Sequence, residues 1–181
     1  LEANGMGNGI ANDDHVTTAN ISTVLSLDVS SQNISDLTGI EDFISLTDIS
    51  CYNNTILSLD LSNNQHLIYI HCSNNNLTSL DLSDNLNLQT IYCSENYLTS
   101  IVLSSNLTLY HFSCDNNNLT SLDLSTISIL LTLDCSYNQL TTLDVSQTGL
   151  TGLLCTNNLL DSLDVSQNYN LVGLYCSNNN L

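Results

Sequence analysis

Seven cysteines recur along this chain, and thiols at a regular spacing suggest disulfides, a soft-metal site or a row of small apolar core residues. The gaps between them are 21, 21, 21, 21, 20 and 21 residues. No C-x-x-C pair is present, so zinc lacks its usual ligand spacing. If the units stack in register, neighbouring Cβ directions run parallel, and an odd number of cysteines cannot all pair. We therefore predict free, buried thiols at Cys51, Cys72, Cys93, Cys114, Cys135, Cys155 and Cys176.

Aspartates recur with the same period inside Ser-Leu-Asp-Leu-Ser segments, with Val102 interrupting the column. Carboxylates flanked by hydroxyls are ligands that Ca²⁺ prefers, although it takes about six to eight oxygens. No D-x-D-x-D-G calcium loop is present. The alternative is that each carboxylate accepts hydrogen bonds from nearby serine and backbone groups. The candidate calcium ligands are Asp60, Asp81, Asp123, Asp144 and Asp164.

The histidines do not form a catalytic arrangement. His71 and His111 fall two units apart in different columns, too far for a shared metal ion, and His15 and His66 lie elsewhere. No Ser-His-Asp grouping or nucleophile elbow is present. We therefore expect no enzymatic activity and no cofactor.

The charge of the chain restricts its partners. The 181 residues include 18 Asp or Glu and no Lys or Arg, which gives a formal net charge of −18. Nucleic-acid binding through basic side chains is excluded, and an anionic membrane surface would repel the chain. No apolar run is long enough to span a bilayer, so we expect no membrane insertion. The partners that remain compatible with this negative charge are neutral, cationic or bridged to the chain by metal ions.

These residues are positioned by a repeated unit, L-x-x-L-x-C-x-x-N-x-L-x-S-L-D-L-S-x-N-x-x. A variant copy with Val29 in place of the cysteine precedes the others. We predict an N-terminal cap remnant over residues 1–20, a variant repeat over 21–45 and seven repeats over 46–181. The last repeat is truncated, as in a piece of a longer protein. The seven copies begin at Leu46, Leu67, Leu88, Leu109, Leu130, Leu150 and Leu171.

The unit predicts a mainly β solenoid of 21-residue coils with a parallel sheet and few or no helices. The cysteine and the apolar residue two positions before it point inward from a short strand. The Leu-x-x-Leu-x-Leu half of each unit predicts a second extended segment. We expect side-chain amides to hydrogen-bond the backbone where each coil bends. These amides belong to Asn54, Asn75, Asn96, Asn117, Asn138, Asn158 and Asn179.

The frame Leu67-x-x-Ile70-x-Cys72-x-x-Asn75-x-Leu77 resembles a leucine-rich repeat. Its cysteine variant, together with the leader from Asn33 to Phe43, resembles secreted bacterial surface proteins of the flavobacterial leucine-rich repeat type. Such proteins usually carry lysines in their turns, and many end in a sorting domain, for which we expect no counterpart within residues 1–181. The resemblance implies an extracellular or cell-surface protein that binds through a concave strand face.

The predicted concave face varies from unit to unit, whereas the core positions repeat. Aromatic rings on such a face give contact area at a low entropic cost and suit protein or glycan binding. A merely solvated face is the alternative. The candidate ligand-binding residues are Tyr52, Tyr69, His71, Thr90, Tyr92, His111, Asp134 and Tyr175.

The sequence thus favours an extracellular leucine-rich repeat module for adhesion or recognition of a protein or glycan. A structural solenoid is the main alternative: its ends would stack into filaments, with divalent cations on the aspartate column. An ice-binding solenoid is a third hypothesis, weakened because the regular face is Ser-x-Asp-x-Ser rather than rows of Thr.

Overall fold

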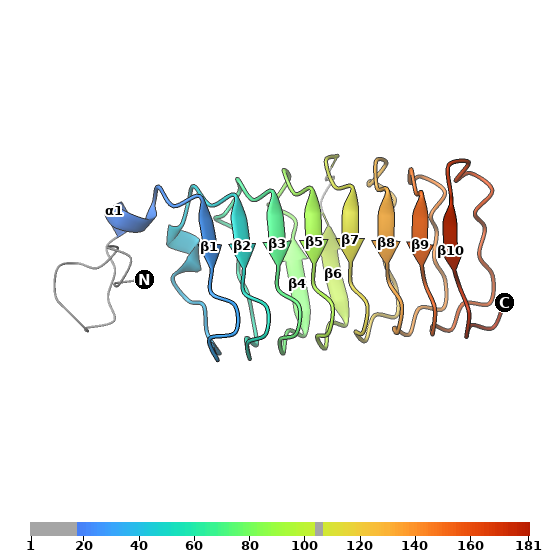
Figure 1. Cartoon of the computed structure of the whole chain (residues 1–181), viewed down its shortest axis with the longest axis horizontal. Coiled ribbons are helices and arrows are strands. Elements are labelled where there is room, and N and C mark those ends of the chain that lie inside the picture. Colours follow the sequence, from blue (N-terminus) through green and yellow to red (C-terminus); the bar gives the residue numbers. More distant parts are fainter. Residues whose placement is uncertain (1–17, 104–106) are drawn as a thin grey trace.

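The computed structural model describes residues 18–103 and 107–181 of the chain, so most of the predicted cap over residues 1–20 lies outside it. The described chain winds into stacked coils whose strands lie side by side along one axis (Figure 1). Its helical elements are one turn of α-helix, α1 (Thr18–Ile21), and one 3-10 turn, η2 (Ile40–Asp42). The predicted mainly β solenoid is confirmed.

Each coil contributes one strand to an eight-stranded parallel sheet of order β1-β2-β3-β5-β7-β8-β9-β10. The strands pair in register, so equivalent residues of successive coils are direct neighbours, as Ile49, Ile70 and Ile91 are. These strands are β1 (Ser26–Asp28), β2 (Asp48–Ser50), β3 (Tyr69–His71), β5 (Thr90–Tyr92), β7 (His111–Ser113), β8 (Thr132–Asp134), β9 (Gly152–Leu154) and β10 (Gly173–Tyr175).

Among the coils that the structure describes, the second half of the repeat forms strands in two, β4 (Ser79–Leu82) and β6 (Ser100–Leu103). They pair with each other in a two-stranded parallel sheet. The equivalent residues 58–61 and 121–124 carry no strand. The predicted second extended segment is therefore confirmed as a regular strand only for these two coils.

The core lies inside the coils and is lined by one apolar residue per strand and by the cysteines. In the eight-stranded sheet, the middle residue of each strand from β2 to β9 is buried, and six of the seven cysteines are buried with it. Cys176 is half-buried, and all seven thiols are free. Val29 is partly buried and packs against the same core in the variant first coil. The predicted ladder of free, buried thiols is confirmed for Cys51 to Cys155.

Burial raises the pKa of the six buried thiols, since the thiolate is poorly solvated in an apolar interior. It raises the pKa of Cys51 to about 12 and that of Cys155 to about 11. The pKa of Cys114 lies well above its ordinary value because of burial and, to a smaller extent, the neighbouring Cys93. These thiols are therefore poor nucleophiles in the folded chain.

We predict that a thiol reagent at pH 8 modifies the native protein rapidly at Cys176 only. The other six thiols should react only after unfolding in denaturant, because burial limits both access and ionisation. Timed quenching with peptide mass spectrometry measures the order of labelling. A Cys176→Ser variant should show no fast phase, and rapid native labelling of most thiols would contradict the stacked core.

A ladder of buried asparagines ties each coil to the one before it. Nδ2 of Asn117 donates to the carbonyl oxygen of Cys114 at 3.0 Å and to that of Cys93, in the preceding coil, at 3.1 Å. Its Oδ1 accepts the backbone N–H of Leu98 at 2.9 Å. Asn75, in an earlier coil, makes the equivalent bonds. The predicted role of the asparagine column is confirmed.

The residue before each ladder asparagine adopts a left-handed conformation that turns the chain at the bend. This position has φ near 54° in several coils and is mostly asparagine, as at Asn74 and Asn116. Asparagine tolerates this region better than most other residues. Glu95 and Tyr137 occupy the same position with φ of 54° and 53°, so the coil geometry overrides local preference there.

We predict that Asn117→Ala lowers the free energy of unfolding by about 3 kcal/mol, because the Leu98 N–H and two carbonyls lose their partner in the interior. Denaturant unfolding followed by circular dichroism measures the change. The matched control is Asn118→Ala, whose side chain accepts one long bond of 3.4 Å from Gln139. It should cost less than about 0.5 kcal/mol, and equal losses would contradict the role of the ladder.

Candidate binding surface

The outer side of the eight-stranded sheet, called here the sheet face, carries the predicted ligand-binding residues. In β2, β3, β5, β7 and β8 the first and third residues are half-buried and flank a buried middle residue. Tyr69 and His71 therefore lie on the same face of β3. Thr90 and Tyr92 lie on the neighbouring β5, in register with them.

Five of these side chains form one continuous group, called here the aromatic cluster: Tyr52, Tyr69, His71, Tyr92 and His111. The ring of Tyr52 stacks on His71 with centroids 4.5 Å apart and an interplanar angle of 24°. Tyr92 connects the two histidines, with centroids 5.2 Å from His71 and 4.9 Å from His111. Tyr69 meets Tyr92 at 5.9 Å with an edge-on geometry. Rings from four coils therefore make one surface feature.

The remaining three candidate residues lie outside the aromatic cluster. Thr90 sits in register between Tyr69 and His111. Asp134 lies on β8, beyond the cluster. Tyr175 lies on β10, separated from β7 by β8 and β9, and is 61% exposed. The structure therefore groups five of the eight predicted side chains, with Thr90 between two of them.

Carboxylates border the aromatic cluster on both sides. Asp48 is the register neighbour of Tyr69, and its Oδ2 accepts the Thr47 hydroxyl at 2.6 Å. Asp115 accepts the Ser113 hydroxyl at 2.9 Å, a hydrogen bond from the Ser94 hydroxyl, and the Asn116 amide at 2.7 Å. These bonds hold the carboxylates in place on the sheet face.

Partial burial shifts the pKa values of three members of the aromatic cluster: Tyr69, His71 and His111. It lowers the pKa of both His71 and His111 below the ordinary value, because the imidazolium loses hydration. The negative charge of Asp28 partly offsets this shift at His71. Burial, followed by the proximity of Tyr92, Asp48 and Tyr52, raises the pKa of Tyr69. These shifts favour the uncharged forms of Tyr69, His71 and His111 at neutral pH.

We predict that the free energy of unfolding falls as the pH drops from about 6.5, the ordinary histidine value. As the pH falls, the unfolded chain binds protons at His71 and His111 at a higher pH than the folded chain does. The stability that is fully present above about pH 6.5 is therefore lost progressively until the pH reaches the lower pKa values of the folded chain. Histidine NMR titration and melting curves from pH 7 to 5 measure the effect.

A His71→Gln/His111→Gln variant is the control for this prediction. Its free energy of unfolding should lose most of the pH dependence between about pH 6.5 and 5. The aspartates do not supply this dependence, because their lowered pKa values make stability depend on pH only below the ordinary value of 3.8. Histidine NMR midpoints at or above 6.5 in the folded protein would contradict the prediction.

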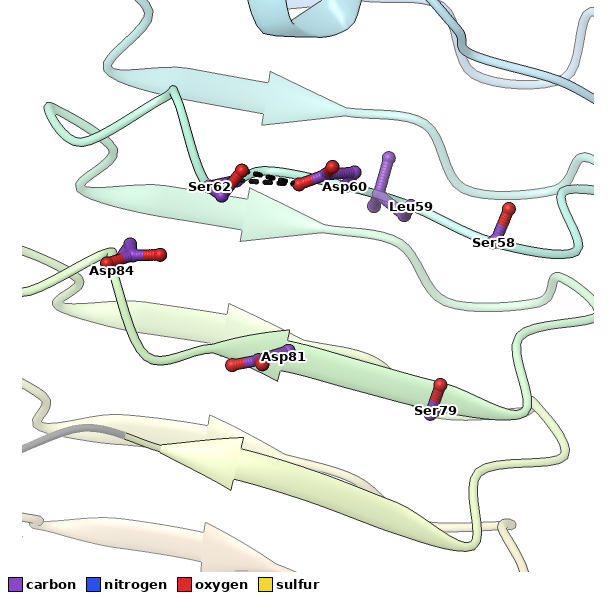
Figure 2. Close-up of a pocket in the computed structure, with 7 residues that line it drawn as sticks. All are labelled: Ser58, Leu59, Asp60, Ser62, Ser79, Asp81 and Asp84. Carbon is purple, nitrogen blue, oxygen red and sulfur yellow. Dashed lines mark hydrogen bonds between the residues drawn. The ribbon is translucent and has the colours of Figure 1, made fainter.

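The aspartate column lies away from the sheet face, in the Ser-Leu-Asp-Leu-Ser half of the coils. Oδ1 of Asp60 accepts the backbone N–H of Ser62 at 3.0 Å and its hydroxyl at 2.7 Å. Figure 2 shows this pair beside Asp81 in a pocket of serines and carboxylates. Asp123, Asp144 and Asp164 accept the same backbone bond from the serine two residues on.

These bonds lower the pKa of the column aspartates, and for Asp60 the backbone N–H of Ser62 is the first cause. The hydrogen bonds expected under the structural alternative are therefore present. Among residues 18–103 and 107–181, no group of three or more His, Cys, Asp or Glu side chains is arranged to hold a metal ion. Calcium binding by this column stays a prediction.

Sequence reasoning did not identify a groove that runs along the coils just before the strands. It is lined by apolar and polar side chains four and six positions before the cysteine or its equivalent. The signal available in the sequence was an apolar residue four positions before the cysteine or its equivalent, as at Leu25 and Ile68, which are both exposed. The complete lining is Leu25, Ser45, Thr47, His66, Ile68, Asn87, Gln89 and Thr108.

Comparisons with known proteins agree with this architecture. The functional domain of InlJ from Listeria monocytogenes, which includes a cysteine ladder, is 36% identical with a TM-score of 0.74, covering 91% of this chain and 42% of that chain. YopM, a leucine-rich effector protein from Yersinia pestis, is 27% identical with a TM-score of 0.65, covering 75% of this chain and 38% of that chain. Internalin C2 from Listeria monocytogenes is 23% identical with a TM-score of 0.71, covering 91% of this chain and 76% of that chain.

The chain is a leucine-rich repeat solenoid, and these three structural neighbours, which share its fold, are bacterial proteins. It spans less than half the length of the InlJ domain and of YopM. No protein-family model matches the sequence, and the search of curated proteins gives no match. In the described part of the chain, no helix has the length and apolar character needed to cross a bilayer.

Proposed function

We propose that this chain is the binding module of an extracellular or cell-surface protein of the secreted bacterial leucine-rich repeat type, and that it serves adhesion or recognition. The partner is a protein or glycan that docks on the sheet face. The observation that carries the proposal is the aromatic cluster, in which rings from four coils are in continuous contact on the outer side of the sheet.

The contrast between the two sides of each strand supports this proposal. Inward positions repeat the same apolar residue types from coil to coil, as stability requires. Outward positions change between Asp48, Tyr69, Thr90 and His111 along one column. Aromatic residues are enriched at the centres of protein interfaces, where they supply most of the binding energy.

The test uses a glycan array and a panel of purified extracellular proteins, probed with the native chain and with a variant that carries serine at Tyr69, His71, Tyr92 and His111. Ligands of the native chain should lose at least about tenfold in affinity, because their central contacts are removed. Far-UV circular dichroism and melting curves confirm that the variant folds.

The matched control carries alanine at four exposed serines of the other half of the coils and should keep every ligand. Ligands that bind the native chain and the aromatic-cluster variant equally well would contradict the proposal. The control substitutions are at Ser58, Ser79, Ser121 and Ser162.

A further inference from the structure

The charge around the aromatic cluster has one sign. Asp28 on β1 and Asp48 on β2 lie at one end of the cluster. Asp115, just after β7, and Asp134, on β8, lie at its other end. The chain has no lysine or arginine, so no basic side chain within it neutralises these carboxylates. The uncharged rings are therefore held between two negative borders.

Such a surface favours a cationic group. The face of a tyrosine ring attracts a guanidinium or ammonium ion placed within about 6 Å of its centre. A neighbouring carboxylate adds a charge-assisted hydrogen bond, which a guanidinium can make with two of its N–H groups. An anionic partner meets only repulsion on this face.

From this arrangement we infer that the sheet face binds a partner protein through an extended, arginine-bearing segment lying across the strands. The inference rests on the proposed function and names the chemistry of its partner. One arginine contacts the Asp48 border, one lies over the aromatic cluster and one contacts Asp115.

The spacing of the borders sets the spacing of the basic residues. Asp48 on β2 is in register with His111 on β7, three strand steps or about 14 Å away, and Asp115 lies four residues beyond His111, about 13 Å along the chain. The backbones of Asp48 and Asp115 are therefore about 20 Å apart on a diagonal across the sheet face. In an extended segment, residues i and i+4 on one side are about 13 Å apart. An Arg-x-Arg-x-Arg segment lying along this diagonal therefore reaches both borders when its two outer arginine side chains extend outward toward the carboxylates.

The experiment uses the full chain and the peptide Gly-Ser-Arg-Ser-Arg-Ser-Arg-Ser-Gly at 150 mM salt, which screens exposed charges beyond about 8 Å. The comparison peptide has citrulline at the three arginine positions, which keeps the shape and removes the charge. Isothermal titration calorimetry gives Kd, and NMR shift changes locate the site. The arginine peptide should bind at least about tenfold more tightly, with shifts confined to β2–β8.

Variants separate a built site from general attraction to an acidic chain. Tyr69→Leu/Tyr92→Leu leaves the net charge unchanged and should weaken binding of the arginine peptide at least about tenfold. Tyr69→Phe/Tyr92→Phe keeps the rings and should stay within about threefold of the native chain. Asp60→Asn/Asp81→Asn removes two charges from the other half of the coils and should change Kd less than about twofold.

Three results would overturn the inference in distinguishable ways. Equal Kd values for the native chain and the Tyr→Leu variant, with both weakened by Asp60→Asn/Asp81→Asn, would show attraction to net charge alone. A citrulline peptide that binds as tightly as the arginine peptide would overturn the cationic partner. So would array ligands that are neutral glycans and depend on the aromatic cluster, and this last result would leave the proposed function standing.

Discussion

The structure depends on the hydrogen bonding of one buried carboxamide per coil. A coil that bends sharply turns backbone N–H and C=O groups into its interior, and each unpaired group there costs free energy of about 1–3 kcal/mol. Asn96 and Asn117 satisfy these groups in their own coil and in the preceding one. The same atoms therefore complete the bend and fix the offset between neighbouring coils.

This fixed offset explains why the sequence repeats where it does. When equivalent residues are direct neighbours, each core position must be filled by a side chain that tolerates a copy of itself above and below. Cysteine meets this need as a small apolar residue beside the asparagine ladder, and leucines and isoleucines make up most of the rest of the core. The six buried thiols are structural, since burial raises their pKa and lowers their reactivity.

The same stacking frees the outer side of the sheet for variation. A substitution at an outward position disturbs neither the ladder nor the core, so successive coils can present different side chains at small, regular separations. Here the neighbours are rings flanked by carboxylates, in a chain without basic residues. The proposed binding surface and its preference for a cationic partner both follow from that juxtaposition.

The sequence by itself determined the coil length, the inward cysteines, the asparagine ladder and the strand at each repeat, because each depends on a side-chain type recurring every 21 residues. It also placed Tyr69, His71, Tyr92 and His111 on one face. Only the tertiary structure decided that Tyr52 stacks on His71, that Tyr175 lies apart, and that the second segment pairs as strands only at β4 and β6. Those outcomes depend on side-chain orientation and on small differences between adjacent coils, which a periodic pattern does not specify.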